Sequence, residues 1–389
     1  MKLLKSTLLK ISIALLMCIS VTLPYTLIVS ASEGSYKASV LIDANTLKVL
    51  SSKNKDMILP QASVTKLMTY LVVMDTLKSS SIPLNKKVVV DIDLSVIPAD
   101  GSKINLKKGD TLTINQLIES LLIVSANDSA LVLEKMVSDI TKKDFINLMN
   151  EKAKELGLNK TNFINTSGLT EKDKGYNTTT AYEIAILSKD IIDSYPETLK
   201  ITSKKSFTFN GVTYPSTNKL LSKGIGVDGM KTGFTNEAGY CLSSTVNIKA
   251  SKKDEKPFRV IAVTLGSPSE EKRTQGQLAL LNSAMNNYWN KRIINKEETF
   301  KMESKYHVGG VIEAVPSKDE FRLINKKTKV ETKTTLKEKI RGKVKKGDKV
   351  GTVTAYFDNT SVEADLIAKE DVKGVNVFKR IQLFFEDLF

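Results

Sequence analysis

The stretch Pro60–Tyr70, PQASVTKLMTY, is the part of this 389-residue sequence that says most about its fold. Its apolar residues, and those that follow as far as residue 77, cover nearly every face of a predicted helix, which is typical of a helix buried in a core. Between Asp56 and Asp75 only Lys66 carries a charge, although 26% of all residues are charged. A lone lysine on a buried helix needs a physical reason, and Ser63 stands three residues before it.

Strands and helices follow one another around this helix. Residues 36–53 (YKASVLIDANTLKVLSSK) predict two short strands that form a hairpin. Capping boxes at Thr113–Gln116 and Thr180–Glu183 each predict the start of a helix. A further helix is expected from Phe145 to Gly157, and Asn127 or Asp128 can cap the helix between. From residue 229 the pattern changes to three strands, and a helix is predicted over residues 270–291, with Trp289 on its apolar side.

This order of elements predicts an α+β fold. Two strands open the domain, helices fill the middle, and three strands and a helix close it, which suggests an antiparallel five-stranded sheet flanked by helices, with a helical insert. Near residue 295 the composition shifts to Lys, Thr and Val alternations, which predict a small β domain. We expect domains over residues 32–292 and 293–370, followed by an amphipathic helix over 371–389 with Val375, Phe378, Ile381, Phe385 and Leu388 on one face.

The first 31 residues predict a secretory signal. Lys2, Lys5 and Lys10 precede an apolar stretch, and the small residues Val29–Ala31 offer a cleavage site. A retained membrane anchor is the alternative. Export places the chain at the outer face of the cytoplasmic membrane and the cell wall, and the mature chain then holds a single cysteine, Cys241, expected to be a buried apolar thiol.

The composition of the chain limits which kinds of active site and binding partner it can have. The only histidine, His307, lies in a lysine-rich segment far along the chain, so neither a serine–histidine triad nor a zinc site with several histidines is favoured. The formal net charge is +15, and it is +12 without the leader, which contains three lysines and no acidic residue. Such a charge favours anionic lipid headgroups or acidic wall polymers, or is merely a basic surface. No aromatic-basic motif supports nucleic-acid binding.

Ser63 and Lys66 are neighbours on a helix because they lie three residues apart. A serine hydroxyl needs an adjacent base to act as a nucleophile, and Lys66 can be that base only if burial lowers its pKa towards about 7–8. The charge-free helix supplies this environment. Taken alone, the pair also fits a lysine that extends from a helix end to solvent.

Two more stretches fit a catalytic cleft. Ser125-Ala126-Asn127 falls at a break between two apolar helices, where side chains can project, although an ordinary helix cap is the simpler explanation. Lys231-Thr232-Gly233 opens a strand. Its Lys-Thr pair suits a carboxylate, and Gly233 allows a substrate backbone to approach closely.

The three stretches, in this order, resemble the penicillin-binding protein and serine β-lactamase superfamily, with its signatures S-x-x-K, S-x-N and K-T-G. The surrounding segments MILPQASVTKLMT, LLIVSANDSA, TNFINTSGL and GMKTGFTNEAGYCL are similar to those of D-alanyl-D-alanine carboxypeptidases, the low-molecular-weight penicillin-binding proteins. The resemblance is strong over residues 36–292 and weaker over the β domain and tail. It implies a β-lactamase/transpeptidase-like catalytic domain at residues 32–292.

The resemblance also implies roles. Ser63 would be the acyl-forming nucleophile, Lys66 its base and Ser125 a proton relay. Asn127 would hold the lysine and the substrate amide.

On strand 229–235, the resemblance implies that Lys231, Thr232 and Gly233 receive the terminal carboxylate of a D-Ala-D-Ala peptide. The backbone of Phe234 would join that of Ser63 in the oxyanion hole. Some family members carry histidine at the Phe234 position, so a side-chain role is lost here. The expected reaction removes terminal D-alanine from peptidoglycan stem peptides, needs no metal or cofactor, and is blocked covalently by β-lactam antibiotics.

Two rival functions remain open at this stage. Class A β-lactamases use a glutamate in an E-x-x-L-N stretch, and Glu155–Asn159 matches that pattern, although a solvent-facing glutamate at a helix end is expected there. A non-catalytic wall-binding module is the second rival. For the tail, the amphipathic helix predicts contact with the membrane surface, and packing on the β domain is the alternative.

Overall fold

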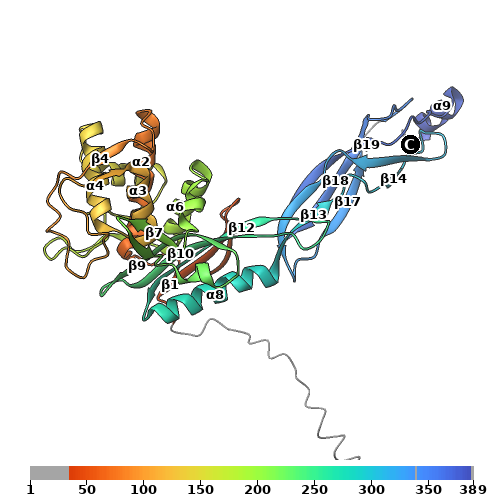
Figure 1. Ribbon diagram of the computed structural model, residues 1–389. Coiled ribbons are helices and arrows are strands. Elements are labelled where there is room, and N and C mark those ends of the chain that lie inside the picture. The colour runs from red at the N-terminus through yellow and green to blue at the C-terminus, as the bar shows by residue number, and fades with distance from the viewer. Residues whose placement is uncertain (1–34, 338–339, 387–389) are drawn as a thin grey trace, which may run out of the picture.

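The computed structural model describes residues 35–337 and 340–386 (Figure 1). The predicted leader over residues 1–31 lies outside the described residues, as does Leu388 of the predicted tail face.

The first domain is built on a five-stranded antiparallel sheet, which confirms the predicted α+β fold class. The two opening strands and the three closing strands lie side by side, although about 170 residues of the chain separate them. The strand order across the sheet is β2 (Val49–Lys53), β1 (Ala38–Asp43), β12 (Phe258–Ser267), β10 (Gly239–Ile248) and β9 (Val227–Thr235). β9 is therefore an edge strand, free to face the helical insert.

Both faces of the sheet are covered by apolar side chains. Side chains alternate along a strand, so Val40 and Ile42 of β1 join the core shared with the helical insert, whereas Leu41 joins the core under α8 (Glu270–Asn287). All six residues of β1 are buried. Figure 1 shows α8 along one side of the sheet and the insert on the other.

The buried helix predicted from the opening stretch is α2 (Lys66–Ser79), and eleven of its fourteen residues are buried. The insert and the flanking segments supply further helices and several short strands. The helices are α3 (Ile114–Glu119), α4 (Asn127–Thr141), α5 (Phe145–Glu155), α6 (Ala181–Ser194) and α7 (Thr198–Thr202). The short strands are β3 (Leu59–Pro60), β4 (Lys87–Val89), β5 (Thr111–Thr113), β6 (Thr178–Thr179), β7 (Ser206–Phe209), β8 (Val212–Pro215) and β11 (Glu255–Lys256).

Two predicted helix boundaries are wrong. The helix expected over residues 270–291 ends at Asn287, and Trp289 lies in the strand β13 (Tyr288–Ile294), which pairs with β16 (Glu320–Asn325). Sheet pairing with a distant segment therefore overrides the local helical pattern. Neither Asn127 nor Asp128 caps α4 from outside, because Ala126 occupies that position and both polar side chains bond elsewhere.

The local signals at other helix ends agree with the structure. The capping box of Thr113 and Gln116 is complete at the start of α3, with 3.1 Å from the Gln116 amide to Thr113 Oγ1. Thr180 accepts from the Glu183 amide at the start of α6, while the Glu183 carboxylate turns to Lys160 and Thr161. Gly157, with φ 71°, follows the end of α5 as predicted.

The C-terminal region has its own sheet and its own apolar core. Its five strands are antiparallel wherever they pair, and the segment lies well away from the helical insert (Figure 1). The order is β14 (Phe300–Glu303), β15 (Val311–Pro316), β19 (Thr360–Ala368), β18 (Lys349–Phe357) and β17 (Glu331–Leu336). The last helix, α9 (Val377–Glu386), lies at the far tip.

The tail helix begins later than predicted. Val375 precedes α9, and its amide bonds to the Tyr306 carbonyl of the β domain. Phe378, Ile381 and Phe385 are exposed on α9, whereas Leu383 is buried. Among the described residues, none of the helices is both long enough and apolar enough to cross a bilayer.

Because α2 is the centre of the larger core, truncating it should be costly. We expect Leu71→Ala, at a side chain only 1% exposed, to lower the free energy of unfolding of the first domain by about 2–5 kcal/mol. Val96, 71% exposed in a loop, provides the matched control, since Val96→Ala should change it by less than about 0.5 kcal/mol. Urea unfolding followed by far-ultraviolet circular dichroism at the helical signal, to which α2–α8 of the first domain contribute most, measures both. Equal effects of the two variants would contradict the central role of α2.

Candidate active site

Ser63 and Lys66 lie at the junction of two helical elements. Ser63 belongs to a 3₁₀ turn, Ala62–Thr65, and Lys66 is the first residue of α2, so the pair does not share one α-helix as predicted. Ser63 is partly accessible and lines a cleft, whereas the Lys66 side chain is fully buried. The turn thus exposes the hydroxyl at the surface of the cleft while the lysine reaches it from within the protein.

Three oxygen atoms surround the Lys66 ammonium position. Nζ lies 2.8 Å from Ser63 Oγ, 2.7 Å from Asn127 Oδ1 and 2.7 Å from the Ser167 carbonyl. A neutral amine has two N–H bonds and one lone pair. It can donate to the amide oxygen of Asn127 and the carbonyl of Ser167, which leaves the lone pair to accept the Ser63 hydroxyl proton. The ammonium form can donate to all three oxygens, so the arrangement accommodates both the base before proton transfer and its conjugate acid afterwards.

Burial lowers the pKa of Lys66 from 10.5 to about 7, because desolvation disfavours the ammonium form. The buried carboxylate of Asp128 opposes this effect by favouring the charged form. Asp128 is itself fixed by backbone amides, with 3.0 Å to the Ile104 amide and 3.1 Å to the Leu106 amide. At neutral pH a large fraction of Lys66 is thus deprotonated.

A sharp bend in the insert presents Ser125 and Asn127 to the cleft. A π-helical turn, Ser120–Val124, ends at Ser125 in the left-handed conformation, with φ 68°. Asn127 then begins α4, and its side-chain oxygen accepts a hydrogen bond from Lys66. Ser125 lines the cleft, but its hydroxyl makes no hydrogen bond within the described residues. The predicted break between two helices is therefore present and turns both side chains inward.

The edge strand β9 forms the opposite wall. Thr232, Gly233 and Phe234 line the cleft, while Lys231 is 1% exposed beneath it and donates to the Thr232 carbonyl over 2.7 Å. Burial lowers the pKa of Lys231 well below its ordinary value, and the neighbouring charge of Lys66 lowers it further. Two lysines in one dry site repel each other, so full protonation of both is disfavoured.

Two glycines allow other segments to approach the nucleophile. A Cβ atom on Gly233 would lie 2.9 Å from the Gln61 carbonyl and 3.0 Å from the Ser63 amide nitrogen. On the other side, a Cβ on Gly168 would lie 1.9 Å from the Ala62 carbonyl oxygen, and Gly168 has φ 81°. The glycine of K-T-G thus lets β9 pack against the turn that carries Ser63.

Phe234 keeps its side chain in the cleft. It is 48% exposed, and its ring stacks on Tyr240 with 4.2 Å between ring centroids. The Tyr240 ring in turn lies 5.6 Å from the Arg273 guanidinium carbon. An aromatic pair therefore forms part of the cleft wall between β9 and the start of α8.

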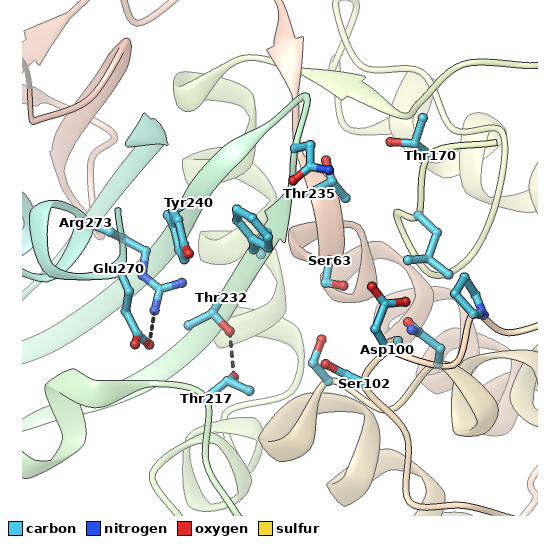
Figure 2. Close-up of a pocket in the computed structure, with 18 of the residues that line it drawn as sticks. Ser63, Asp100, Ser102, Thr170, Thr217, Thr232, Thr235, Tyr240, Glu270 and Arg273 are labelled. Atoms are coloured by element: carbon cyan, nitrogen blue, oxygen red, sulfur yellow. Dashed lines mark hydrogen bonds and ion pairs between the residues drawn. The ribbon is translucent and has the colours of Figure 1, made fainter. Parts of the chain in front are cut away.

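Arg273 is a cleft residue that the sequence did not single out. It is 4% exposed, lines the cleft, and donates to Glu270 over 3.0 Å, while its Nε is buried without a hydrogen bond within the described residues. Figure 2 shows its guanidinium turned towards Tyr240 and Thr232. A buried guanidinium with a free N–H is suited to receive an anion.

Thr217 and Ser167 were also missed. The Thr217 and Thr232 hydroxyls lie 2.6 Å apart on facing walls (Figure 2), and the Ser167 carbonyl contacts Lys66. Ser167 lies in the stretch TNFINTSGL, which carried the family resemblance without indicating a role. No local pattern marks Thr217 or Arg273, because only the folded chain brings their segments to β9.

A single cleft of about 640 Å³ is lined by Ser63, Ser125, Asn127, Thr217, Thr232 and Arg273, while Lys66, Lys231 and Ser167 lie outside its lining. Figure 2 shows Ser63 between two ends, with Arg273 and Glu270 at one and Asp100 and Thr170 at the other. Glu155, the candidate for a β-lactamase glutamate, does not line it. It is exposed at the end of α5 and pairs with Lys152 over 2.7 Å. Cys241 is buried, as predicted, and burial raises its pKa to about 11.

Comparison with known protein families gives two adjoining matches. Residues 26–269 match the family described as D-alanyl-D-alanine carboxypeptidase, which covers more than half of the chain. Residues 288–374 match the family described as penicillin-binding protein 5, C-terminal domain.

Individual relatives agree with these matches. The chain is 31% identical over 352 residues to the D-alanyl-D-alanine carboxypeptidase DacF of Bacillus subtilis, covering 87% of this chain and 86% of that protein. The crystal structure of penicillin-binding protein 5 from Haemophilus influenzae is similar, with a TM-score of 0.63, 29% identity and coverage of 87% and 98%. Penicillin-binding protein D2 from Listeria monocytogenes, solved in a cefotaxime-bound form, has a TM-score of 0.54 and 33% identity, with coverage of 64% and 96%.

The environment of Lys66 leads to a direct prediction. In protein carrying ¹³C-labelled lysine, the Lys66 side-chain resonance should titrate with a midpoint of about pH 7, since burial disfavours its charged form. The spectrum of Lys66→Met assigns the resonance by its absence. A midpoint above about pH 9 would show that the buried amine is protonated in the free protein, and another base would then be required.

Proposed function

Because the chain belongs to the D-alanyl-D-alanine carboxypeptidase family of serine peptidases, we propose that it removes the terminal D-alanine from peptidoglycan stem peptides with Ser63 as its nucleophile. The single observation that carries this proposal is the 2.8 Å contact between Ser63 Oγ and the buried amine of Lys66. A serine and a neutral lysine in contact form a nucleophile and its base without histidine.

Acylation follows from this contact. Ser63 Oγ attacks the carbonyl carbon of the penultimate D-alanine, and its proton passes to the Lys66 amine. The bond to the terminal D-alanine then breaks, and its amine takes up a proton that Ser125 relays from Lys66. Asn127 holds Lys66 in place and can accept or donate to the substrate amide. The product is an ester between Ser63 and the shortened peptide.

Deacylation reverses the proton transfers. Lys66, neutral again, takes a proton from water as the water attacks the ester carbonyl, and Ser63 recovers its proton when the ester bond breaks. In both half-reactions the carbonyl oxygen becomes negative. The backbone N–H groups of Ser63 and Phe234 are assigned to stabilise it. The close approach of β9 at Gly233, where a Cβ atom would lie 3.0 Å from the Ser63 amide nitrogen, supports this placement.

The cationic end of the cleft is assigned to the substrate carboxylate. Arg273 supplies positive charge, and Lys231, whose pKa is lowered by burial and by the neighbouring cations, takes up a proton more readily once an anion binds beside it. The Thr232 and Thr217 hydroxyls, in mutual contact, can both turn to a carboxylate oxygen. A peptide that ends in a carboxylate would thus be placed with its penultimate carbonyl beside Ser63.

Covalent inhibition by β-lactams is the corresponding proposal for antibiotics. A β-lactam carries a reactive amide next to a carboxylate, and the Listeria relative was solved with cefotaxime bound. A class A β-lactamase activity has no support, because Glu155 lies outside the cleft and is paired with Lys152. We expect a long-lived acyl-enzyme rather than rapid turnover.

The domain arrangement suits an enzyme at the membrane and wall. We assign residues 32–292 to the catalytic domain, 293–370 to the β domain and 371–389 to a tail that meets the outer face of the cytoplasmic membrane after export. Phe378, Phe385 and Ile381, which are 80%, 55% and 51% exposed on α9, support membrane contact. Lys379 lies on the same helix and could meet anionic lipid.

The first test of this function is release of D-alanine from a pentapeptide that ends in D-Ala-D-Ala. The wild-type protein should release it, and Ser63→Ala should lower the rate at least about 10³-fold, because the nucleophile is lost. Labelled penicillin should acylate the wild type and not the variant.

Lys66→Met, which removes the base while keeping a buried unbranched side chain, should be similarly inactive and should still fold. Wild-type protein that binds wall peptides but releases no D-alanine would contradict a carboxypeptidase and favour the binding module.

The tail is tested by truncation after Asn376. This cut removes α9 and keeps residues 372–375, which bond to the β domain. We expect the truncated protein to lose co-sedimentation with vesicles of phosphatidylglycerol while D-alanine release is retained. Phe378→Glu combined with Phe385→Glu should act alike, since charge at these exposed positions opposes insertion. Undiminished vesicle binding of both proteins would contradict the membrane role.

A further inference from the structure

The charged side chains that line the cleft are divided between its two ends. Arg273 and Lys219 line the end with Thr217, where Glu270 is paired with Arg273. At the other end the charged residues among the described lining are acidic, namely Asp100 and Glu237. The chain has a net charge of +15, so its overall composition does not account for an acidic end to the substrate cleft.

The two carboxylates come from opposite walls. Asp100 lies in the loop before α3, on the side of Gly101 and Ser102, and its carboxylate makes no hydrogen bond or ion pair within the described residues. Lys103, the nearest cation in that loop, does not line the cleft and donates to the Pro98 carbonyl over 3.2 Å. Asp100 is therefore an exposed negative charge with no bonded partner in the part of the chain that the structure describes.

Glu237 follows β9 and is held in place. Its carboxylate accepts a hydrogen bond from Thr170 Oγ1 over 2.6 Å, which joins the end of β9 to the loop that carries Ser167. That bond also keeps the pKa of Glu237 below its ordinary value, so the group is charged at neutral pH. A fixed carboxylate loses little conformational entropy when it meets a cation.

The direction of the substrate follows from the other end. The guanidinium of Arg273, which lines the cleft, marks where an anion binds, and the leaving residue of a carboxypeptidase substrate carries that carboxylate. With the reacting carbonyl at Ser63, the rest of the peptide must extend away from Arg273, towards Asp100 and Thr170 (Figure 2). An extended chain advances about 3.3 Å per residue, so the residue before the two D-alanines is the first whose side chain can reach the acidic end.

We propose that Asp100 and Glu237 determine specificity by binding a free side-chain ammonium group on the residue that precedes the terminal D-Ala-D-Ala. The preferred substrate is then a stem peptide whose diamino acid is unblocked, and a stem whose side-chain amine has been acylated is a poorer one. This inference rests on the proposed carboxypeptidase function and adds the substrate class to it.

The test compares two substrates that differ only in that charge. They are Nα-acetyl-L-Lys-D-Ala-D-Ala and Nα,Nε-diacetyl-L-Lys-D-Ala-D-Ala, and the readout is the ratio of their kcat/KM values for D-alanine release. At low salt the wild type should prefer the free amine by about three- to ten-fold, the size expected for exposed ion pairs. The preference should fall steeply at about 0.5 M salt, because the charges are screened.

Variants identify the source of the preference. Asp100→Asn and Glu237→Gln should each reduce the ratio, and the double variant should bring it close to one. Asp91→Asn is the matched control: it removes an equal charge from the same loop, is paired with Lys108 at 3.4 Å, and does not line the cleft, so the ratio should stay at the wild-type value. Thr170→Val breaks the bond to Glu237 without removing charge and should keep most of the ratio.

The possible outcomes distinguish a failure of this inference from a failure of the proposed carboxypeptidase function on which it rests. Equal kcat/KM values for the two substrates in the wild type, with D-alanine released from both, would overturn the specificity and leave the carboxypeptidase intact. A preference that survives in the double variant, or disappears equally in Asp91→Asn, would show that these carboxylates are not its source and would also overturn it. Release from neither substrate would instead count against the proposed function.

Discussion

The structure depends on burying one ionisable side chain, Lys66, among uncharged partners. Lowering its pKa from 10.5 to about 7 corresponds to roughly 5 kcal/mol against the ammonium form. The whole stability of a domain is about 5–15 kcal/mol, so only an extensive apolar core can tolerate such a group. The nearly complete burial of α2, which a surface helix would not need, provides that core. The apolar run in the sequence therefore serves chemistry as well as packing.

The cleft lies where the edge strand of the sheet faces the helical insert. β9 is the last strand of its sheet, so one side of its backbone is left for a substrate. The insert faces it with the turn that carries Ser125 and Asn127. Gly168 and Gly233 bring both walls against the turn of Ser63, where a side chain on either would collide with backbone atoms. The nucleophile is thus held by backbone packing on two sides, which favours preorganisation over mobility.

Much of this arrangement could be predicted from local sequence. The charge-free run predicted a buried helix around Lys66, and the strand patterns predicted the five-stranded sheet, because both signals depend on neighbours along the chain. Trp289 was misplaced since its helical spacing continues that of α8, while its actual partner is β16 in the next domain. Asn127 looked like a helix cap because its competing partner, Lys66, is 61 residues away. Arg273 and Thr217 carried no signal, since only tertiary packing brings them to the cleft.

The cleft also shows why its chemistry and its charge distribution cannot be separated. Lys66, Lys231 and Arg273 are all buried near one another, and Asp128 is the buried carboxylate that acts on Lys66. Their mutual repulsion, added to desolvation, keeps the pKa of Lys231 low and leaves that end of the cleft short of negative charge. A carboxylate that binds there stabilises positive charge nearby, so by Coulomb's law it raises the pKa of Lys66 and makes the amine a stronger base. Departure of the terminal residue with its carboxylate lowers that pKa again, so Lys66 is neutral once more when it must take a proton from the attacking water. The same anion that fixes the position of the substrate thus strengthens the base while Ser63 loses its proton, and its departure leaves Lys66 neutral for deacylation.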